Sequence, residues 1–184
     1  MLLSPRLGAR LYGVSILLLL VVALGRIYAT ELGLLDPIPQ ATPSRTAQAD
    51  IPGRYLGLYQ HAARHQCPGL PWTILAGVGK VESDHGRAPQ PGARSGWNHA
   101  GAAGPMQFGI GVGRAGNAWA RYGTGRPSDV YKPEHAIPAA ARKLCADGAP
   151  RGLDGALYAY NPSSAYVARV KRWAARYTQG NGRR

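Results

Sequence analysis

Apolar residues recur at the three- and four-residue spacing of amphipathic helices from Ile51 to about Thr178. Residues 85–104 lack this spacing and predict a loop, and no run of alternating residues predicts a long strand. We therefore expect a mainly helical domain with at most a small β element in residues 85–110. The expected helices cover 51–66, 71–82, 117–122, a segment from Pro133 or Pro138 to 146, 153–160 and 165–177.

The segment 71–82 is apolar on nearly every side, and Pro71 suits the first turn of a helix. It should therefore be the central, buried helix of the domain. Leu75, Val78 and Glu82 stand at positions i, i+3 and i+7, so a carboxylate continues the buried stripe at the carboxyl end.

Burial and the negative end of the helix dipole both disfavour the ionised form of such a carboxylate. Both effects raise its pKa, and a carboxylic acid that keeps its proton near neutral pH serves as a general acid. Glu82 is therefore the candidate catalytic residue. The alternative is that its side chain turns outward or pairs with Lys80 or Arg87.

The amino-terminal part of the chain has a different pattern. Residues 11–25 carry no charge and follow Arg6 and Arg10. Fifteen helical residues span roughly 22 Å, which suits a long secretory signal or, with a short extension, a membrane anchor. Either role exports the rest of the chain. The expected organisation is an anchor or signal peptide at 1–29, a proline-containing tether at 30–50, one domain at 51–178 and a polar tail at 179–184.

Two cysteines, Cys67 and Cys145, lie in the exported part. An oxidising compartment permits a bridge between them, and we expect a disulfide. The alternative is two independent buried thiols.

Length and charge narrow the class of protein. A chain of 184 residues holds one compact domain, and 22 Lys and Arg against 9 Asp and Glu give a net charge of +13. Such a surface attracts an anionic partner: nucleic acid, an acidic membrane or an acidic cell-wall polymer. Nucleic acid is not expected, because the aromatic residues beside the arginines of 165–177 belong to the apolar stripe of that helix.

Three motifs occur in order along the domain. They are Val81-Glu82-Ser83, then Gly101-Ala102-Ala103-Gly104-Pro105-Met106-Gln107-Phe108, and then Ala156-Leu157-Tyr158-Ala159-Tyr160-Asn161 followed by Tyr166-Val167. In this order the chain resembles the soluble lytic transglycosylases of the lysozyme-like superfamily. The resemblance spans residues 51–178 and implies a lysozyme-like α+β fold that cleaves peptidoglycan glycan strands between N-acetylmuramic acid and N-acetylglucosamine.

The resemblance also implies roles for single residues. Glu82 is the only essential acid and base, and the hydroxyl of Tyr160 orients it. An attack by the muramyl C6 hydroxyl replaces the second carboxylate that ordinary glycosidases need. The implied partner is peptidoglycan, the implied location is the bacterial envelope outside the cytoplasmic membrane, and the protein should be a monomer without cofactor or metal. The implied substrate-binding residues are Ser83, Asn98, Met106, Gln107, Tyr160 and Asn161.

The chain departs from the family pattern at Pro105, where leucine is usual, at Gly109, where methionine is frequent, and at Pro162, where glycine is usual. Asn98 replaces an expected serine unless Ser95 takes that place. Trp97 either stacks on a sugar or packs the loop onto the core. Two rival functions are a hydrolytic muramidase and a wall-binding module without turnover. The G-x-G-x-x-G pattern at 111–116 lacks the strand context of a dinucleotide site.

Overall fold

The computed structural model describes residues 40–178, and the expected anchor or signal peptide, the first part of the tether and the polar tail lie outside this range. The described chain is mainly helical with one two-stranded sheet, which confirms the predicted class. Its helices are α2 (Arg45–Asp50), α3 (Gly53–Gln66), α4 (Trp72–Ser83), α5 (Ala118–Tyr122), α6 (Pro133–Ala146), α7 (Leu153–Tyr160) and α8 (Ser164–Thr178). Short 3-10 turns cover η1 (Gly113–Ala115) and η2 (Pro127–Tyr131).

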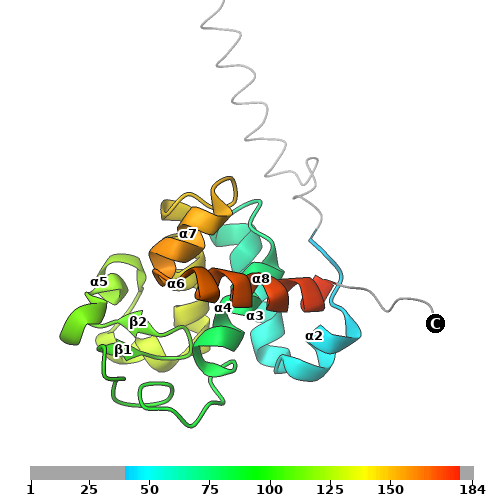
Figure 1. The fold of residues 1–184 in the computed structure, drawn as a ribbon. Coiled ribbons are helices and arrows are strands. Elements are labelled where there is room, and N and C mark those ends of the chain that lie inside the picture. Colours follow the sequence, from blue (N-terminus) through cyan, green and yellow to red (C-terminus); the bar gives the residue numbers. More distant parts are fainter. Residues whose placement is uncertain (1–39, 179–184) are drawn as a thin grey trace, which may run out of the picture. The chain divides into compact units, whose positions relative to one another are not determined.

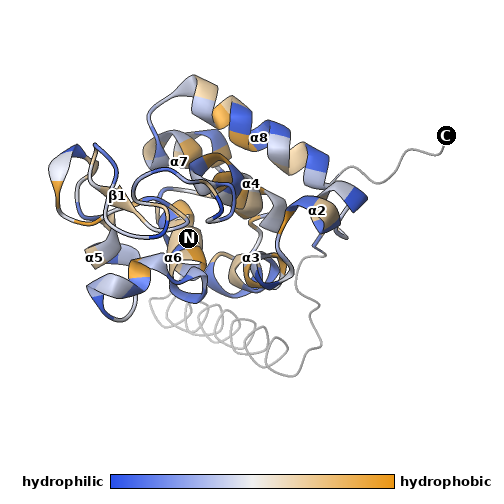
Figure 2. Cartoon of the chain, turned by 90° about the horizontal axis from the view of Figure 1, so that it is seen from below, coloured by the Kyte–Doolittle hydropathy of each residue, from blue (hydrophilic) through white to orange (hydrophobic). Residues whose placement is uncertain are grey.

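Helix α4 is the central helix, as its apolar sequence predicts. It packs against α3, α6 and, most extensively, α8 (Figure 1). The close approach of α8 depends on Gly77, because a Cβ there would lie 2.7 Å from the backbone oxygen of Val170. Figure 2 shows the apolar colouring of α4 inside the surrounding helices, whereas α8 is largely hydrophilic.

The β element is the small one that the sequence predicts. β1 (Ala102–Ala103) pairs antiparallel with β2 (Phe108–Gly109), and Ala103 lies opposite Phe108. The strands and α5 lie at one end of the domain, away from α2 (Figure 1). The loop 84–101 connects this end to the carboxyl end of α4.

The domain begins earlier than the expected boundary at residue 51. Ser44 caps α2 by accepting a hydrogen bond from the amide of Ala47, and the amide of Ser44 bonds to the carbonyl of Tyr177 on α8. The indole of Trp72 donates to the carbonyl of Ala41 at 2.7 Å. Residues 40–50 therefore belong to the folded unit and are not a tether.

Cys67 and Cys145 form a disulfide with a Cα–Cα distance of 5.4 Å, as predicted. The bridge joins the end of α3 to the last turn of α6, across 78 residues of sequence. Within residues 40–178 no helix has the length and apolar character needed to cross a bilayer, and the apolar run 11–25 lies outside that range.

Candidate active site

Glu82 lies in the last turn of α4. The helix ends there because Asp84 and His85 take left-handed backbone conformations, with φ values of 51° and 54°, and a left-handed residue closes a helix. Lys80 and Arg87, the alternative partners for Glu82, instead bind Asp84. The side chain of Glu82 is half-buried and lines a cleft.

The direct partner of Glu82 is Tyr166 from the first turns of α8. The hydroxyl of Tyr166 donates a hydrogen bond of 2.7 Å to Oε1 of Glu82. Tyr166 is itself buried, so its ring holds the hydroxyl at a fixed place. Because α8 packs along α4, the pairing joins two residues 84 positions apart.

Tyr160 does not take the orienting role that the resemblance implies for it. Its hydroxyl donates to the carbonyl oxygen of Met106 at 2.8 Å. Its ring stacks on that of Tyr166, with centroids 6.5 Å apart and planes 5° apart. Tyr160 therefore positions the wall of the cleft and supports Tyr166, whereas Tyr166 contacts the carboxylate.

Burial raises the pKa of Glu82 to about 7. The hydrogen bond from Tyr166 and the positive charge of Arg169 act in the opposite direction, because both favour the carboxylate. Near neutral pH a large fraction of Glu82 is therefore protonated, and the hydroxyl of Tyr166 stabilises the ionised form. A carboxyl group whose pKa is close to the ambient pH can act as an acid and then as a base.

The cleft at Glu82 has a volume of about 640 Å³ and reaches from the carboxyl end of α4 to the sheet and the end of α7. Among the described residues that line it, Glu82 is the only carboxylate. Two basic side chains, Arg114 and Lys143, also line it. Lys143 forms an ion pair with Asp147 at 2.6 Å, so its charge is balanced within the fold.

Asn98 and Gln107 form one wall of this cleft. The side-chain amide of Asn98 donates to Oε1 of Gln107 at 2.9 Å, and the amide of Gln107 donates to the carbonyl of Gly104 at 2.9 Å. The side-chain oxygen of Asn98 accepts bonds from the amides of Ala100 and Ala102. The two side chains therefore hold the loop to the sheet and present their remaining polar edges to the cleft.

Two of the expected substrate-binding residues do not line the cleft. The hydroxyl of Ser83 donates to the carbonyl of Pro105 at 2.6 Å and accepts a bond from the amide of Gly86 at 2.8 Å. Met106 is fully buried. Ser83 therefore joins the end of α4 to the loop between the strands, and Met106 belongs to the core. Asn98, Gln107, Tyr160 and Asn161 do line the cleft.

Trp97 has 57% of its surface exposed, so it does not pack the loop onto the core. It is also absent from the residues that line the cleft at Glu82. The free indole face therefore leaves the sugar-stacking alternative as a prediction.

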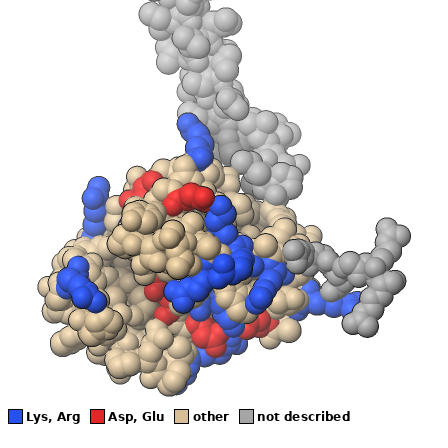
Figure 3. Space-filling model, viewed as in Figure 1, with Lys and Arg blue, Asp and Glu red and all other residues tan. Residues whose placement is uncertain are grey.

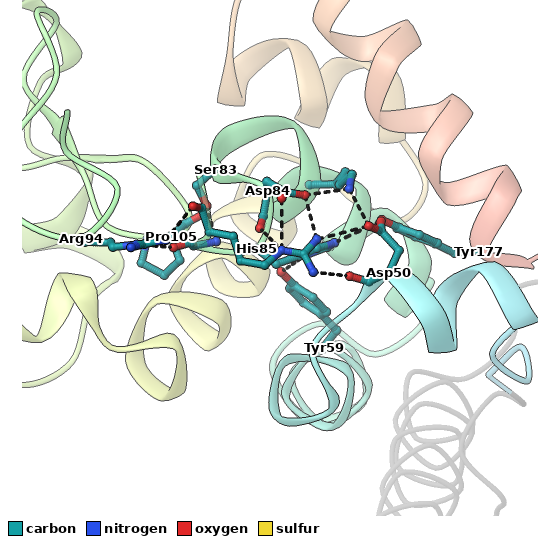
Figure 4. Close-up of polar contacts among 11 residues, drawn as sticks. Asp50, Tyr59, Ser83, Asp84, His85, Arg94, Pro105 and Tyr177 are labelled. Atoms are coloured by element: carbon teal, nitrogen blue, oxygen red, sulfur yellow. Dashed lines mark hydrogen bonds and ion pairs between the residues drawn. The ribbon is translucent and has the colours of Figure 1, made fainter. Parts of the chain in front are cut away.

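Behind the end of α4 lies a buried polar cluster centred on His85 (Figure 4). The hydroxyl of Tyr177 donates to Asp50 at 2.6 Å and has no second proton, so the Nε2 of His85, 3.1 Å away, must donate to Tyr177. The Nδ1 of His85 then accepts from the hydroxyl of Tyr59 at 2.9 Å. Burial lowers the pKa of His85 to about 4, which keeps the ring neutral.

The same cluster holds four ion pairs at the end of the helix. Lys80 and Arg87 both reach Asp50 and Asp84, with separations from 2.6 to 3.2 Å. The left-handed turn that follows Glu82 is therefore fixed by polar contacts from α2, α3 and α8.

Sequence reasoning did not single out Tyr166, Arg114 or Lys143 as residues of the site. Tyr166 stands on the apolar stripe of α8, which indicates burial but not a partner. Within residues 40–178 no three His, Cys, Asp or Glu side chains lie close enough together to hold a metal ion.

Comparison with models of known protein families finds none that matches this chain. A search of curated proteins likewise finds no significant match.

Proposed function

We propose that this protein is a lytic transglycosylase that cleaves the β-1,4 bond between N-acetylmuramic acid and N-acetylglucosamine in peptidoglycan. The observation that carries the proposal is the state of Glu82, which lines the cleft with a pKa of about 7 and accepts a hydrogen bond from Tyr166. The choice of peptidoglycan as the substrate rests on the order of the motifs around Glu82, Gln107 and Tyr160, which implies a lysozyme-like fold.

In the proposed reaction Glu82 acts twice. The protonated carboxyl first gives its proton to the glycosidic oxygen, and the bond from that oxygen to C1 of the muramyl ring breaks. Tyr166 occupies Oε1, so Oε2 is the oxygen that carries the proton to the substrate. The resulting carboxylate is stabilised by Tyr166 and by the charge of Arg169.

The carboxylate then takes the proton of the muramyl C6 hydroxyl as that oxygen attacks C1. One bond to C1 is broken and one is formed, the proton returns to Glu82, and no water is consumed. The product is a 1,6-anhydro-muramyl end. A second carboxylate is needed only where water or an enzyme nucleophile attacks C1, which agrees with Glu82 being the only carboxylate among the described cleft residues.

The proposal places the domain in the bacterial cell envelope, outside the cytoplasmic membrane. The apolar run 11–25 would act there as anchor or signal. The Cys67–Cys145 disulfide supports this location, because disulfides persist in oxidising compartments.

The test is a digest of purified peptidoglycan by the full chain, with the products separated and weighed. A lytic transglycosylase releases muropeptides that are one water lighter than their hydrolysed equivalents. Glu82→Gln should abolish release while the thermal unfolding curve remains cooperative. Glu134→Gln is the matched control, because Glu134 pairs with Arg54 on the surface of α6 and should not affect release.

Reducing ends in place of anhydro ends would assign the hydrolytic reaction to the same site. If the protein releases no products from peptidoglycan of several wall types, the result would favour a wall-binding module without turnover. Loss of activity in Glu134→Gln with full activity in Glu82→Gln would overturn the site.

A further inference from the structure

Three arginines form a row along one flank of α8. Arg169, Arg172 and Arg176 follow each other at three- and four-residue spacing, which places them on one side of the helix. All three are exposed. Figure 3 shows basic side chains gathered over the face of the domain where α8 lies in Figure 1. We call these three residues the arginine row.

The charges of the arginine row are not balanced by the described part of the fold. Among residues 40–178 no carboxylate lies within 4.0 Å of any of the three guanidinium groups, whereas Lys171 on the other side of the helix pairs with Asp154. The nearby carboxylates Asp50 and Asp84 are already bound by Lys80 and Arg87.

The row begins beside the candidate active site. At one end Arg169 lies about one turn of α8 after Tyr166, whose hydroxyl binds Glu82, and its positive charge lowers the pKa of Glu82. At the other end Arg176 lies 4.7 Å from the ring centroid of Trp173, and Lys80 of α4 lies 4.7 Å from the same centroid. The row therefore starts near Glu82 at the carboxyl end of α4 and runs toward the amino end of α4, where Thr178 of α8 bonds Thr73.

We infer that the arginine row binds the free carboxylates of the peptide stems that branch from the muramyl sugars of the glycan, an inference that rests on the proposed substrate. Arg169 and Arg176 are separated by about 10 Å along the helix at 1.5 Å per residue. An extended stem of four residues spans roughly 14 Å at about 3.4 Å per residue. Arginine is well suited to this ligand, because its fork of N–H donors matches a carboxylate.

Two other anionic partners fit the row less well. Proteins that bind single-stranded nucleic acid stack its bases on aromatic rings beside basic residues. The ring of Trp173 is not free for stacking, because the cations of Lys80 and Arg176 lie over it. A membrane-surface helix inserts its apolar stripe into the lipid, but Tyr166, Val170 and Tyr177 of α8 are buried in the core.

The test measures binding of the full chain carrying Glu82→Gln, so that turnover does not consume the ligand. The ligand is insoluble peptidoglycan, either native or with its carboxylates converted to amides by a carbodiimide and ammonia. The test variant adds Arg172→Gln and Arg176→Gln, and a rescue variant carries Arg172→Lys and Arg176→Lys instead. The matched control removes two exposed arginines elsewhere, Arg64→Gln on α3 and Arg151→Gln before α7.

We expect the test variant to bind native peptidoglycan roughly three- to tenfold more weakly than its parent, as the loss of two exposed ion pairs implies. The variant with Arg172→Lys and Arg176→Lys should recover only part of the affinity, because lysine keeps the charge and lacks the fork of donors, and the matched control should equal the parent. Amidation should weaken the parent to the level of the test variant and remove the difference between them.

Equal binding of parent and test variant to native peptidoglycan would overturn the inference, as would a difference that persists after amidation. Row-dependent binding to vesicles of anionic phospholipid, with none to peptidoglycan, would assign the row to lipid. Release of anhydro products by the protein with Glu82 intact is scored separately. If the arginine substitutions weaken binding but the protein with Glu82 intact releases no anhydro products, the proposed reaction is rejected. The inference that the arginine row binds stem carboxylates then still stands.

Discussion

The hydroxyl of Tyr166 on α8 donates a hydrogen bond to Oε1 of Glu82 on α4, with 2.7 Å between the two oxygen atoms. The bond favours the carboxylate, whereas burial of the same group favours the protonated acid. The two effects leave the pKa of Glu82 at about 7. The pairing therefore lowers a pKa that burial raises, and it leaves Oε2 as the carboxyl oxygen without this bond.

The first prediction concerns Tyr166→Phe. Loss of the hydrogen bond removes stabilisation from the carboxylate, so the pKa of Glu82 should rise above its value of about 7. Hydrogen bonds to charged groups contribute about 1.5–3 kcal/mol, so turnover at neutral pH should fall by roughly tenfold or more. Turnover measured as a function of pH, together with a carbon NMR titration of Glu82, checks both effects.

Tyr160→Phe is the matched control, because the hydroxyl of Tyr160 binds the Met106 carbonyl and not the carboxylate. It should leave the pKa of Glu82 closer to the wild-type value than Tyr166→Phe does. A larger pKa change in Tyr160→Phe than in Tyr166→Phe would contradict this assignment of roles.

The second prediction is that Glu82→Gln stabilises the protein at alkaline pH. The pKa of Glu82 is about 7 in the folded state against 4.5 in the reference state, so the folded protein binds more protons between these values. Wild-type stability therefore falls as the pH rises from 4.5 to 7, and stays lower above that. The variant should exceed the wild type by about 1–3 kcal/mol at pH 8.

Urea unfolding at pH 4 and pH 8 checks this prediction, and the two proteins should differ little at pH 4. If the variant is less stable than the wild type at pH 8, the ionised form of Glu82 does not destabilise the folded protein, and the prediction is wrong.

Local patterns predicted the elements that bury a long stripe. The helix at 71–82 and the helix at 165–177 each repeat their apolar positions over three or more turns, and both are present. Helix α2 has six residues and one buried side chain, Ala47, so no period could reveal it. Its place in the fold depends on contacts of Ser44 and Asp50 with Tyr177, which are remote in sequence.

For the candidate site, the sequence likewise predicted the residue with a local signal and not its partner from another helix. Glu82 was found because a carboxylate breaks an apolar stripe, which is a local feature. The choice between Tyr160 and Tyr166 as its partner depends on how α8 lies against α4, which no spacing within either helix specifies. Ser83 was expected at the substrate because it follows Glu82, but one step along a helix turns a side chain by about 100° and directs this one to Pro105.

The third prediction concerns Gly77→Ala. A Cβ at this position would lie 2.7 Å from the carbonyl oxygen of Val170, a backbone atom that cannot move alone. The helices α4 and α8 must separate, at a cost of about 1–3 kcal/mol, and the bond from Tyr166 to Glu82 should lengthen. Both the free energy of unfolding and turnover should therefore fall. Gly57→Ala on α3, where a Cβ would meet nothing within 4 Å, should instead leave turnover unchanged.

The fourth prediction concerns the disulfide between Cys67 and Cys145. It closes a loop with a sequence separation of 78, for which chain entropy predicts about 4–5 kcal/mol of stabilisation. Replacement of both cysteines by serine should lower the free energy of unfolding by about 2–5 kcal/mol. Chemical denaturation of the oxidised protein, the reduced protein and the double variant checks this. Equal stability of all three would contradict it.

The fifth prediction concerns His85, whose pKa is about 4 in the folded state against 6.5 in the reference state. The unfolded chain then binds more protons between these values, so stability should fall as the pH drops from 6.5 to 4. Glu82 has the opposite effect over an overlapping range, so the loss should emerge in the Glu82→Gln background, at about 2–3 kcal/mol. Adding His85→Gln should reduce this slope. A nitrogen NMR titration gives the direct measure: a ring that titrates near pH 6.5 would contradict the neutral tautomer, with its proton on Nε2, that Tyr59 and Tyr177 require.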